Sequence, residues 1–230
     1  MGNIYKITAI DIGNILYLDL YKYAVLETDS EEEILAKQLL MYADMMTKVR
    51  EEIIEGSVVA IRNFGSFSIS KRKSESRYVK FSKAKKLKDN VHSKLKKKML
   101  TNLMLDRKQE DNFLELEDIV RLLLVDNKPI YLNDIENIKE KYKSFESKLQ
   151  RMLVDKILLF FFKVEKLVFE YKLVHINNFG CFYLKNNLLY GLHFKYSSAS
   201  CTYLFKTKMK INSLIDKLNL IKIQKEMPWE

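Results

Sequence analysis

Cysteine, proline and glycine are all scarce in this chain of 230 residues, which has 2 cysteines, 2 prolines and 6 glycines. Two thiols cannot form a disulfide scaffold, and they suit a reducing compartment. An all-β protein with many tight turns would need more glycine and proline, so the composition disfavours that class. The chain is 47% hydrophobic, which is enough for a packed core and argues against global disorder.

Long apolar segments are also lacking. The longest apolar run is Ile157–Phe162, bounded by Lys156 and Lys163. Six residues cannot span a bilayer, so we interpret this run as part of a helix core. Residues Met1–Ala9 lack the basic start and the long apolar stretch of a signal peptide. We therefore expect a cytoplasmic protein with no membrane partner.

No motif of a common enzyme class or cofactor site is present. The chain has neither a Walker loop nor a dinucleotide-binding fingerprint. Cys181, Cys201, His175 and His193 are of types that bind zinc, but their spacing fits no zinc motif. Acidic runs such as Glu51-Glu52 have no His or Ser partner pattern and suit a solvated helix face. The sequence therefore predicts no enzyme, no metal site and no cofactor.

Charge is plentiful and unevenly distributed along the chain. Lys and Arg number 40 and Asp and Glu 30, for a formal net charge of +10. Residues 1–60 have 5 basic and 11 acidic side chains, whereas residues 61–110 have 16 and 4. Residues 111–170 have 10 and 12, whereas residues 171–230 have 9 and 3. Each half changes from acidic to basic, which indicates a repeat whose C-terminal part faces a polyanion.

Hydrophobic periodicity in the first half predicts helices, then a sheet, then a basic helix. One helix is expected over about 11–26, and a second begins at the cap Asp29-Ser30 and ends at Gly56. After Gly56 the period changes to two. The strands predicted from it lie at 58–61, 66–70 and 78–81, and a basic helix follows over 83–97.

The second half repeats this order. The helices predicted there lie at about 115–125, 133–141, 143–171 and 208–221, and the strands at 173–176, 181–184 and 202–205. The heptad Ile61–Phe67 matches Ile176–Phe182 at five of seven positions. We therefore predict an α+β fold of two tandem domains, each with the order helix, helix, three-stranded sheet, helix. The boundaries are 1–98 for the first domain, 99–113 for the linker and 114–230 for the second, divergent domain.

Two segments of the first half resemble the HU/IHF family of bacterial histone-like, DNA-architectural proteins. They are Gly56 with Val58–Phe67, which includes the Phe-Gly-Ser-Phe turn, and Val79–Lys88, which is similar to the family's conserved basic segment. The resemblance covers about residues 10–95. In the second half it covers about 115–220 and depends on the turn Phe179–Phe182 and on the order of elements.

The resemblance implies an intertwined pair of domains whose sheets form a saddle for duplex DNA. It also implies two β-arms that reach round the minor groove, with a proline at each tip that kinks the duplex. This chain departs from that pattern, because only residues 71–77 separate Ser70 from Tyr78 and no proline lies there. The two copies could pair with each other as a pseudo-dimer or with another chain.

The resemblance and the basic runs together predict non-sequence-specific binding to duplex DNA, with a role in compaction and association with the nucleoid. Lys and Arg contacts to phosphates release counterions and need no base reading. The predicted contact residues are Arg62, Lys71, Arg72, Lys73, Arg77, Lys80, Lys83, Lys85, Lys86 and Lys88. The alternative is a degenerate scaffold that mediates protein–protein assembly without DNA, motivated by the short arms and the apolar second half.

Overall fold

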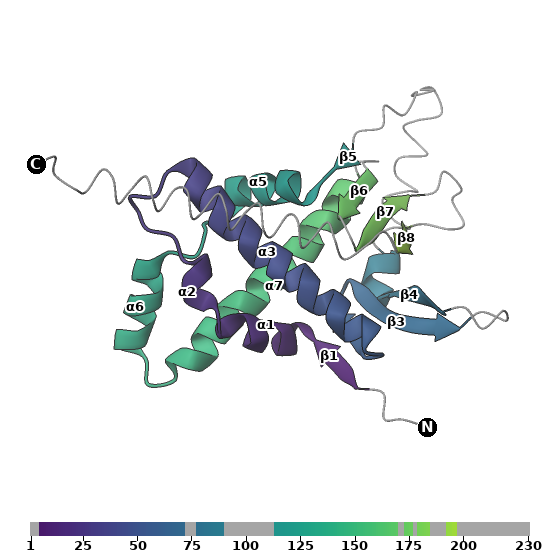
Figure 1. Cartoon of the computed structure of the whole chain (residues 1–230), viewed down its shortest axis with the longest axis horizontal. Helices are drawn as coiled ribbons and strands as arrows, with labels where there is room; N and C mark the ends of the chain where they lie inside the picture. The colour runs from purple at the N-terminus through teal and green to yellow at the C-terminus, as the bar shows by residue number, and fades with distance from the viewer. Residues whose placement is uncertain are drawn as a thin grey trace, which may run out of the picture.

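The computed structural model describes residues 5–71, 77–89, 113–169, 173–176, 179–184 and 192–196. It confirms the α+β class, with two four-stranded sheets on a body of helices (Figure 1). The first half comprises β1 (Lys6–Thr8), α1 (Ala9–Tyr17), α2 (Leu20–Tyr23), α3 (Glu31–Ile54), β2 (Val58–Ile61), β3 (Gly65–Lys71) and β4 (Arg77–Lys83). The second half comprises β5 (Phe113–Leu114), α5 (Leu116–Asp126), α6 (Leu132–Lys141), α7 (Phe145–Phe169), β6 (Leu173–Ile176), β7 (Gly180–Leu184) and β8 (Leu192–Tyr196).

The two sheets have the same topology. In the first, β1 pairs in parallel with β2, and β2, β3 and β4 form an antiparallel meander. In the second, β5 pairs in parallel with β6, and β6, β7 and β8 repeat the meander. The register also repeats, because Phe67 lies opposite Phe81 in the first sheet and Phe182 lies opposite Phe194 in the second.

Several predicted elements need correction. The expected helix over 11–26 is two helices, α1 and α2. The third strand of the second sheet is β8, whereas the segment predicted for it, 202–205, lies outside the described residues. Strands β1 and β5 were not predicted, and β5 begins at residue 113, which the prediction assigned to the linker.

Parts of two predicted helices also lie outside the described residues. Of the basic helix expected over 83–97, Lys83 instead ends β4, residues 85–89 are helical, and residues 90–97 lie outside the described residues. The helix expected over 208–221 is not described either. Among the described helices, none combines the length and the hydropathy needed to cross a lipid bilayer.

The duplication extends to the details of the first helix in each half, α1 and α5. The buried residues of α1 follow an i, i+3, i+4, i+7 pattern, and those of α5 follow the same pattern. They are Ala9, Ile12, Gly13 and Leu16 in α1, and Leu116, Ile119, Val120 and Leu123 in α5. Both helices also begin alike, because the N–H of Thr8 donates to Asp11 Oδ2 at 2.7 Å and the N–H of Glu115 donates to Asp118 Oδ2 at 2.8 Å.

The two halves are intertwined rather than adjacent. Helix α1 packs against α7, and α5 packs against α3, so each long helix is covered by a helix of the other half. In Figure 1 the two long helices cross near the centre, and both sheets lie on the same side of the helical body. The connections that follow α2 and α5 also meet, because the N–H of Val25 donates to the carbonyl of Ile130 at 2.8 Å.

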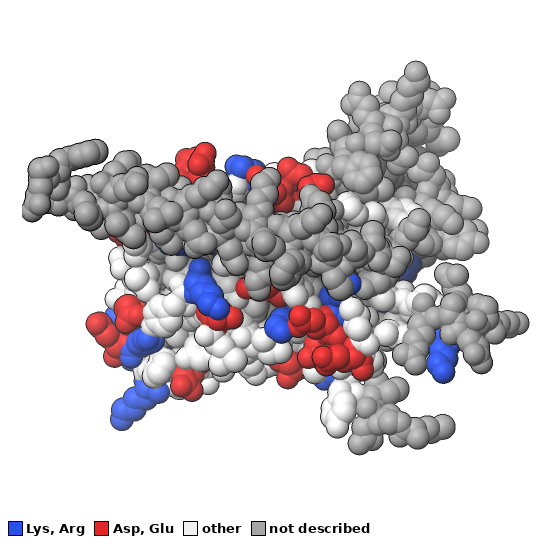
Figure 2. Space-filling view, in the orientation of Figure 1, with Lys and Arg blue, Asp and Glu red and all other residues white. Residues whose placement is uncertain are grey.

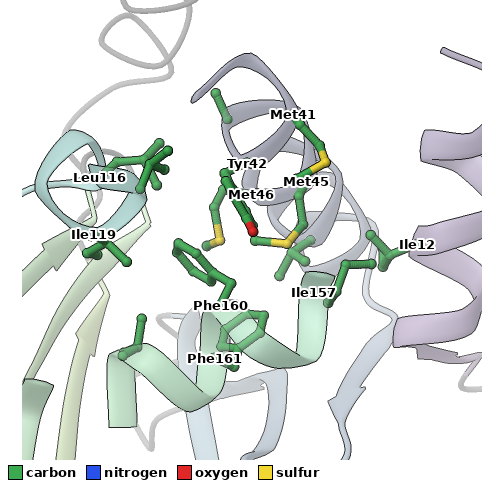
Figure 3. Packing of buried hydrophobic residues seen from close by; sticks show 14 of the residues in the cluster. Ile12, Met41, Tyr42, Met45, Met46, Leu116, Ile119, Ile157, Phe160 and Phe161 are labelled. Atoms are coloured by element: carbon green, nitrogen blue, oxygen red, sulfur yellow. The ribbon is translucent and has the colours of Figure 1, made fainter. Parts of the chain in front are cut away.

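One hydrophobic core therefore serves both halves. At its centre, Tyr42, Met45 and Met46 of α3 face Phe160 and Phe161 of α7 (Figure 3). The rings of Tyr42 and Phe160 are stacked with their centroids 5.2 Å apart. The run Ile157–Phe162, interpreted from the sequence as part of a helix core, thus contributes Ile157, Phe160 and Phe161 to this core.

Aromatic rings join the two sheets to this core. Phe67 of the first sheet lies 5.1 Å from Phe179 and 5.3 Å from Phe194, measured between ring centroids. Phe64 lies 5.0 Å from Phe161 of α7. Edge-to-face and tilted ring pairs at these separations are favourable beyond the area that they bury. The matching Phe-Gly-x-Phe turns of the two halves thus pack against each other.

Gly13 sets the distance between α1 and α7. A Cβ atom at this position would lie 2.8 Å from Cγ2 of Val154, which is too close for two carbons. Val154 cannot easily turn away, because a β-branched side chain in a helix has one strongly preferred rotamer. The glycine therefore permits close approach of helices from the two halves, at a cost in helix propensity of about 1 kcal/mol.

We expect Gly13→Ala to lower the free energy of unfolding by about 1–2 kcal/mol, because overpacking at Val154 outweighs the gain in helix propensity. Urea unfolding followed by circular dichroism measures the change. In a Val154→Ala background the same substitution should be neutral or stabilising, since its steric cause has been removed. A single variant Gly13→Ala as stable as the parent would contradict this packing.

Candidate nucleic-acid interface

The hairpin β3–β4 extends beyond the rest of the first sheet. Strand β2 pairs only with Gly65–Phe67 of β3, whereas β3 and β4 pair from Gly65 and Lys83 as far as Lys71 and Arg77. The outer part of the hairpin is therefore a two-stranded ribbon that projects beyond the sheet. The strands predicted at 66–70 and 78–81 are observed at Gly65–Lys71 and Arg77–Lys83, seven residues each.

The two faces of this ribbon have different chemistry, since directly paired residues lie on the same face. One face has the hydroxyl groups of four serines and one tyrosine, together with Lys80. Its residues are Ser66, Ser68, Ser70, Tyr78, Lys80 and Ser82. The other face has Phe67 and Phe81 near the core and Lys71 at the outer end. The predicted contact residues are thus divided between two faces of one ribbon.

A second group of predicted residues lies at the base of the first sheet. Arg62 is exposed in the turn between β2 and β3, and Lys83 is half-buried at the end of β4. Burial of its ammonium group, followed by the positive charge of Lys88, lowers the pKa of Lys83. Lys85, Lys86 and Lys88 are exposed on the helical turn 85–89, which the fully buried Leu87 anchors to the core.

The predicted contact residues that the structure describes lie in three places: the outer end of the ribbon, its serine face and the base of the sheet. Lys71 and Lys80 are exposed. Arg72 and Lys73 lie outside the described residues, and only the backbone of Arg77 is described. The structure brings Arg62 and Lys86 to the same pocket, whereas Lys80 lies on the serine face of the ribbon.

Acidic side chains border this region. Figure 2 shows them gathered near the C-terminal end of α3, where Glu51, Glu52 and Glu55 lie. Helix α3 has no basic residue in its last turn, so these carboxylates are next to the negative end of the helix dipole. A polyanion would be repelled from the end of α3, so this end is disfavoured as part of an anion-binding surface.

The outward face of the second sheet has different residues. His175 pairs with Cys181, Cys181 pairs with Lys195, and Tyr183 pairs with His193, so these positions share one face. No group of three or more His, Cys, Asp or Glu side chains in the described part of the chain is placed to hold a metal ion. Cys201, the other thiol considered for zinc, lies outside that part.

One buried polar pair lies inside the helical body, away from these surfaces. The hydroxyl of Tyr23 donates to Asp44 Oδ2 at 3.1 Å, and the Gln38 amide donates to the backbone oxygen of Tyr23 at 2.9 Å. Burial, and after it the negative charge of Asp44, raises the pKa of Tyr23. The phenol therefore stays protonated at neutral pH. Its hydrogen bond to Asp44 links α2 to α3.

A pocket of about 450 Å³ lies where the two halves meet. One wall is the turn Arg62–Phe64 with Lys86, all from the first half. The other wall is a face of α7 from the second half. The α7 residues that line it are Asp155, Leu158, Leu159, Phe161, Phe162 and Glu165.

Sequence reasoning missed two features of these surfaces. The serine face could have been found, because Ser66, Ser68 and Ser70 alternate with apolar residues in the period of a strand. The α7 wall of the pocket has no such signal. Asp155 and Phe162 are ordinary positions of a long helix until the turn of the other half lies opposite them.

Comparison of the chain with protein-family models, with curated proteins and with solved structures finds no match.

Proposed function

We propose that the chain binds duplex DNA without sequence preference, mainly through the first half, and acts as an architectural protein of the HU/IHF type. The observation that supports this most is the projecting ribbon β3–β4, with Lys71 and Lys80 exposed on its opposite faces. A two-stranded ribbon fits a DNA groove, where cations on both of its faces reach phosphates of both strands.

Two further observations support the proposal. The intertwined halves with crossed long helices, and with both sheets on one side, are the arrangement that the sequence resemblance implies. The hydroxyl groups of the serine face are hydrogen-bond donors for phosphate oxygens, and they add contacts without adding charge. Compaction of DNA and association with a nucleoid are the roles that we propose for this binding.

The test is fluorescence anisotropy with a labelled 30-base-pair duplex over a salt series. The variant Lys71→Ala/Lys80→Ala/Lys85→Ala removes three exposed cations of the proposed surface. We expect it to bind all duplex sequences about tenfold or more weakly. The slope of log affinity against log salt should fall by up to about 3, because each lost phosphate contact releases about one counterion fewer.

The matched control is Lys141→Ala/Lys143→Ala/Arg151→Ala, which removes the same charge from exposed positions of the helical body. It should retain the affinity of the parent apart from a small, general electrostatic loss. Equal losses in the two triple variants would mean that only net charge matters. Unchanged affinity in the first variant would overturn the assignment of the ribbon.

The alternative function is a scaffold for protein assembly. It is favoured by the outward face of the second sheet, where His175, Cys181 and Tyr183 lie at the positions that Ala60, Ser66 and Ser68 have in the first sheet. Apolar residues of α7 that motivated the alternative are not available to a partner protein, since Phe160 and Phe161 are buried against the first half. Sedimentation over a range of protein concentrations distinguishes the two functions, because a scaffold of this kind would self-associate without DNA.

A further inference from the structure

The pocket between the halves has the features of a small-molecule site rather than of a packing defect. Its volume of about 450 Å³ lies in the range of about 300–1,000 Å³ that is typical of ligand pockets. It is formed by segments far apart in the sequence, the turn at Arg62–Phe64 and helix α7. Its floor and walls are mostly apolar, and charged groups lie around them.

Three charged groups of the pocket, Arg62, Lys86 and Asp155, are candidates for contact with a ligand. Among the described residues, Arg62, Lys86 and Asp155 take part in none of the ion pairs. Arg62 and Lys86 are exposed cations on the wall from the first half, and Asp155 is an exposed carboxylate on the wall from the second half. A ligand with an anionic group at one end and hydrogen-bond donors at the other end would satisfy both walls.

Between the charged groups lies an apolar surface that includes one exposed aromatic ring, Phe162. Leu158, Leu159 and Phe162 face the pocket along α7, between Asp155 and Glu165. These two acidic residues are ten positions apart, which corresponds to about 15 Å along a helix. Phe162 is 62% exposed, although it belongs to a helix whose other phenylalanines near it are buried. An exposed ring beside cations is the arrangement on which nucleobases stack.

We propose that this pocket binds a nucleoside phosphate. Its phosphate group lies at Arg62 and Lys86, its base lies against Phe162 and Leu158, and its amino or hydroxyl groups donate to Asp155. The inference does not rest on the DNA-binding proposal, because duplex DNA keeps its bases stacked inside and cannot present one to Phe162.

The first experiment is isothermal titration calorimetry of the full chain with AMP. Adenosine and inorganic phosphate, titrated separately, represent the nucleoside part and the phosphate part of the ligand. We expect one AMP per chain, and binding of adenosine or of phosphate about tenfold or more weaker than that of AMP, because each lacks one of the contacts. Absence of AMP binding at millimolar concentration would overturn the proposal, as would phosphate that binds as well as AMP.

Variants then locate the site. Phe162→Ser removes the stacking surface at an exposed position, so the fold should persist, and Arg62→Gln/Lys86→Gln removes the phosphate contacts. Each should weaken AMP binding about tenfold. The matched controls are Val125→Ser, at an 83% exposed position of α5, and Lys141→Gln/Lys143→Gln. Equal AMP binding by Phe162→Ser and Val125→Ser would refute the pocket.

An unpaired nucleotide at the end of a DNA strand also presents a base beside a phosphate, here a diester on a deoxyribose, and a competition experiment separates the two sources. A duplex with one unpaired 3′ adenosine that displaces AMP, while the blunt duplex does not, assigns the pocket to strand ends. Displacement by neither duplex assigns it to the free nucleotide. Equal displacement by both would contradict a separate site, since AMP would then occupy only phosphate contacts of the duplex surface. If neither duplex binds the chain at all, the DNA-binding proposal fails, whereas the AMP titration still tests the pocket on its own.

Discussion

Phe67→Ala should lower the free energy of unfolding by about 3–5 kcal/mol, which is the usual range for removal of a fully buried phenylalanine ring. Phe67 is inaccessible to solvent. Its ring lies 4.8 Å from that of Phe81 in its own sheet, and 5.1 Å and 5.3 Å from those of Phe179 and Phe194 in the other half. The cavity would therefore open between the halves, where neither half can close it alone.

The measurement is urea unfolding of the full chain, followed by circular dichroism and by tyrosine fluorescence. Since one core serves both halves, the two probes should report a single transition that moves to lower urea as a whole. Val125→Ala, at an 83% exposed position, is the control and should change stability by less than about 0.5 kcal/mol. A Phe67→Ala chain in which only part of the transition shifts would mean that the halves unfold separately.

The second large effect is expected when the chain is divided after residue 98. Fragment 1–98 would lose α5 and α7, which cover α3 and α1 in the intact chain. Tyr42, Met45 and Met46 would then be exposed to water. We expect that neither fragment unfolds cooperatively as a monomer, and that an equimolar mixture regains the circular dichroism spectrum and the cooperative unfolding of the parent.

The concentration dependence of stability provides the control for this experiment. The mixed fragments should become more stable as their concentration rises, because folding is then coupled to association. The intact chain should have the same midpoint at all concentrations, since its partner half is in the same molecule. A monomeric fragment 1–98 with a cooperative transition of its own would contradict a shared core.

Local signals account for most of the helices. The cap Asp29-Ser30 predicted the start of α3, and the structure has reciprocal capping hydrogen bonds between Ser30 and Glu33. The division between α1 and α2 has no such signal, because neither proline nor glycine lies between Tyr17 and Leu20. Packing of the chain against α7 and α3, rather than its own periodicity, decides where α1 ends.

The strands show what periodicity can and cannot predict. Residues 192–196 alternate apolar and polar types, so β8 could have been found in place of 202–205. Strands β1 and β5, in contrast, are only three and two residues long. No periodic pattern can be recognised in so short a segment, and these strands exist because β2 and β6 offer an edge for parallel pairing.

The sequence by itself determined the duplication, the α+β composition and the distribution of charge. These follow from local causes: caps, the spacing of apolar residues and the repeated Phe-Gly-x-Phe turn. Only the tertiary structure decided which helix covers which, which face of the ribbon holds Lys80, and that Arg62 meets Phe162 across a pocket. The physical reason is that these features depend on contacts between halves far apart in the chain, and complementary shape rather than local pattern selects such contacts.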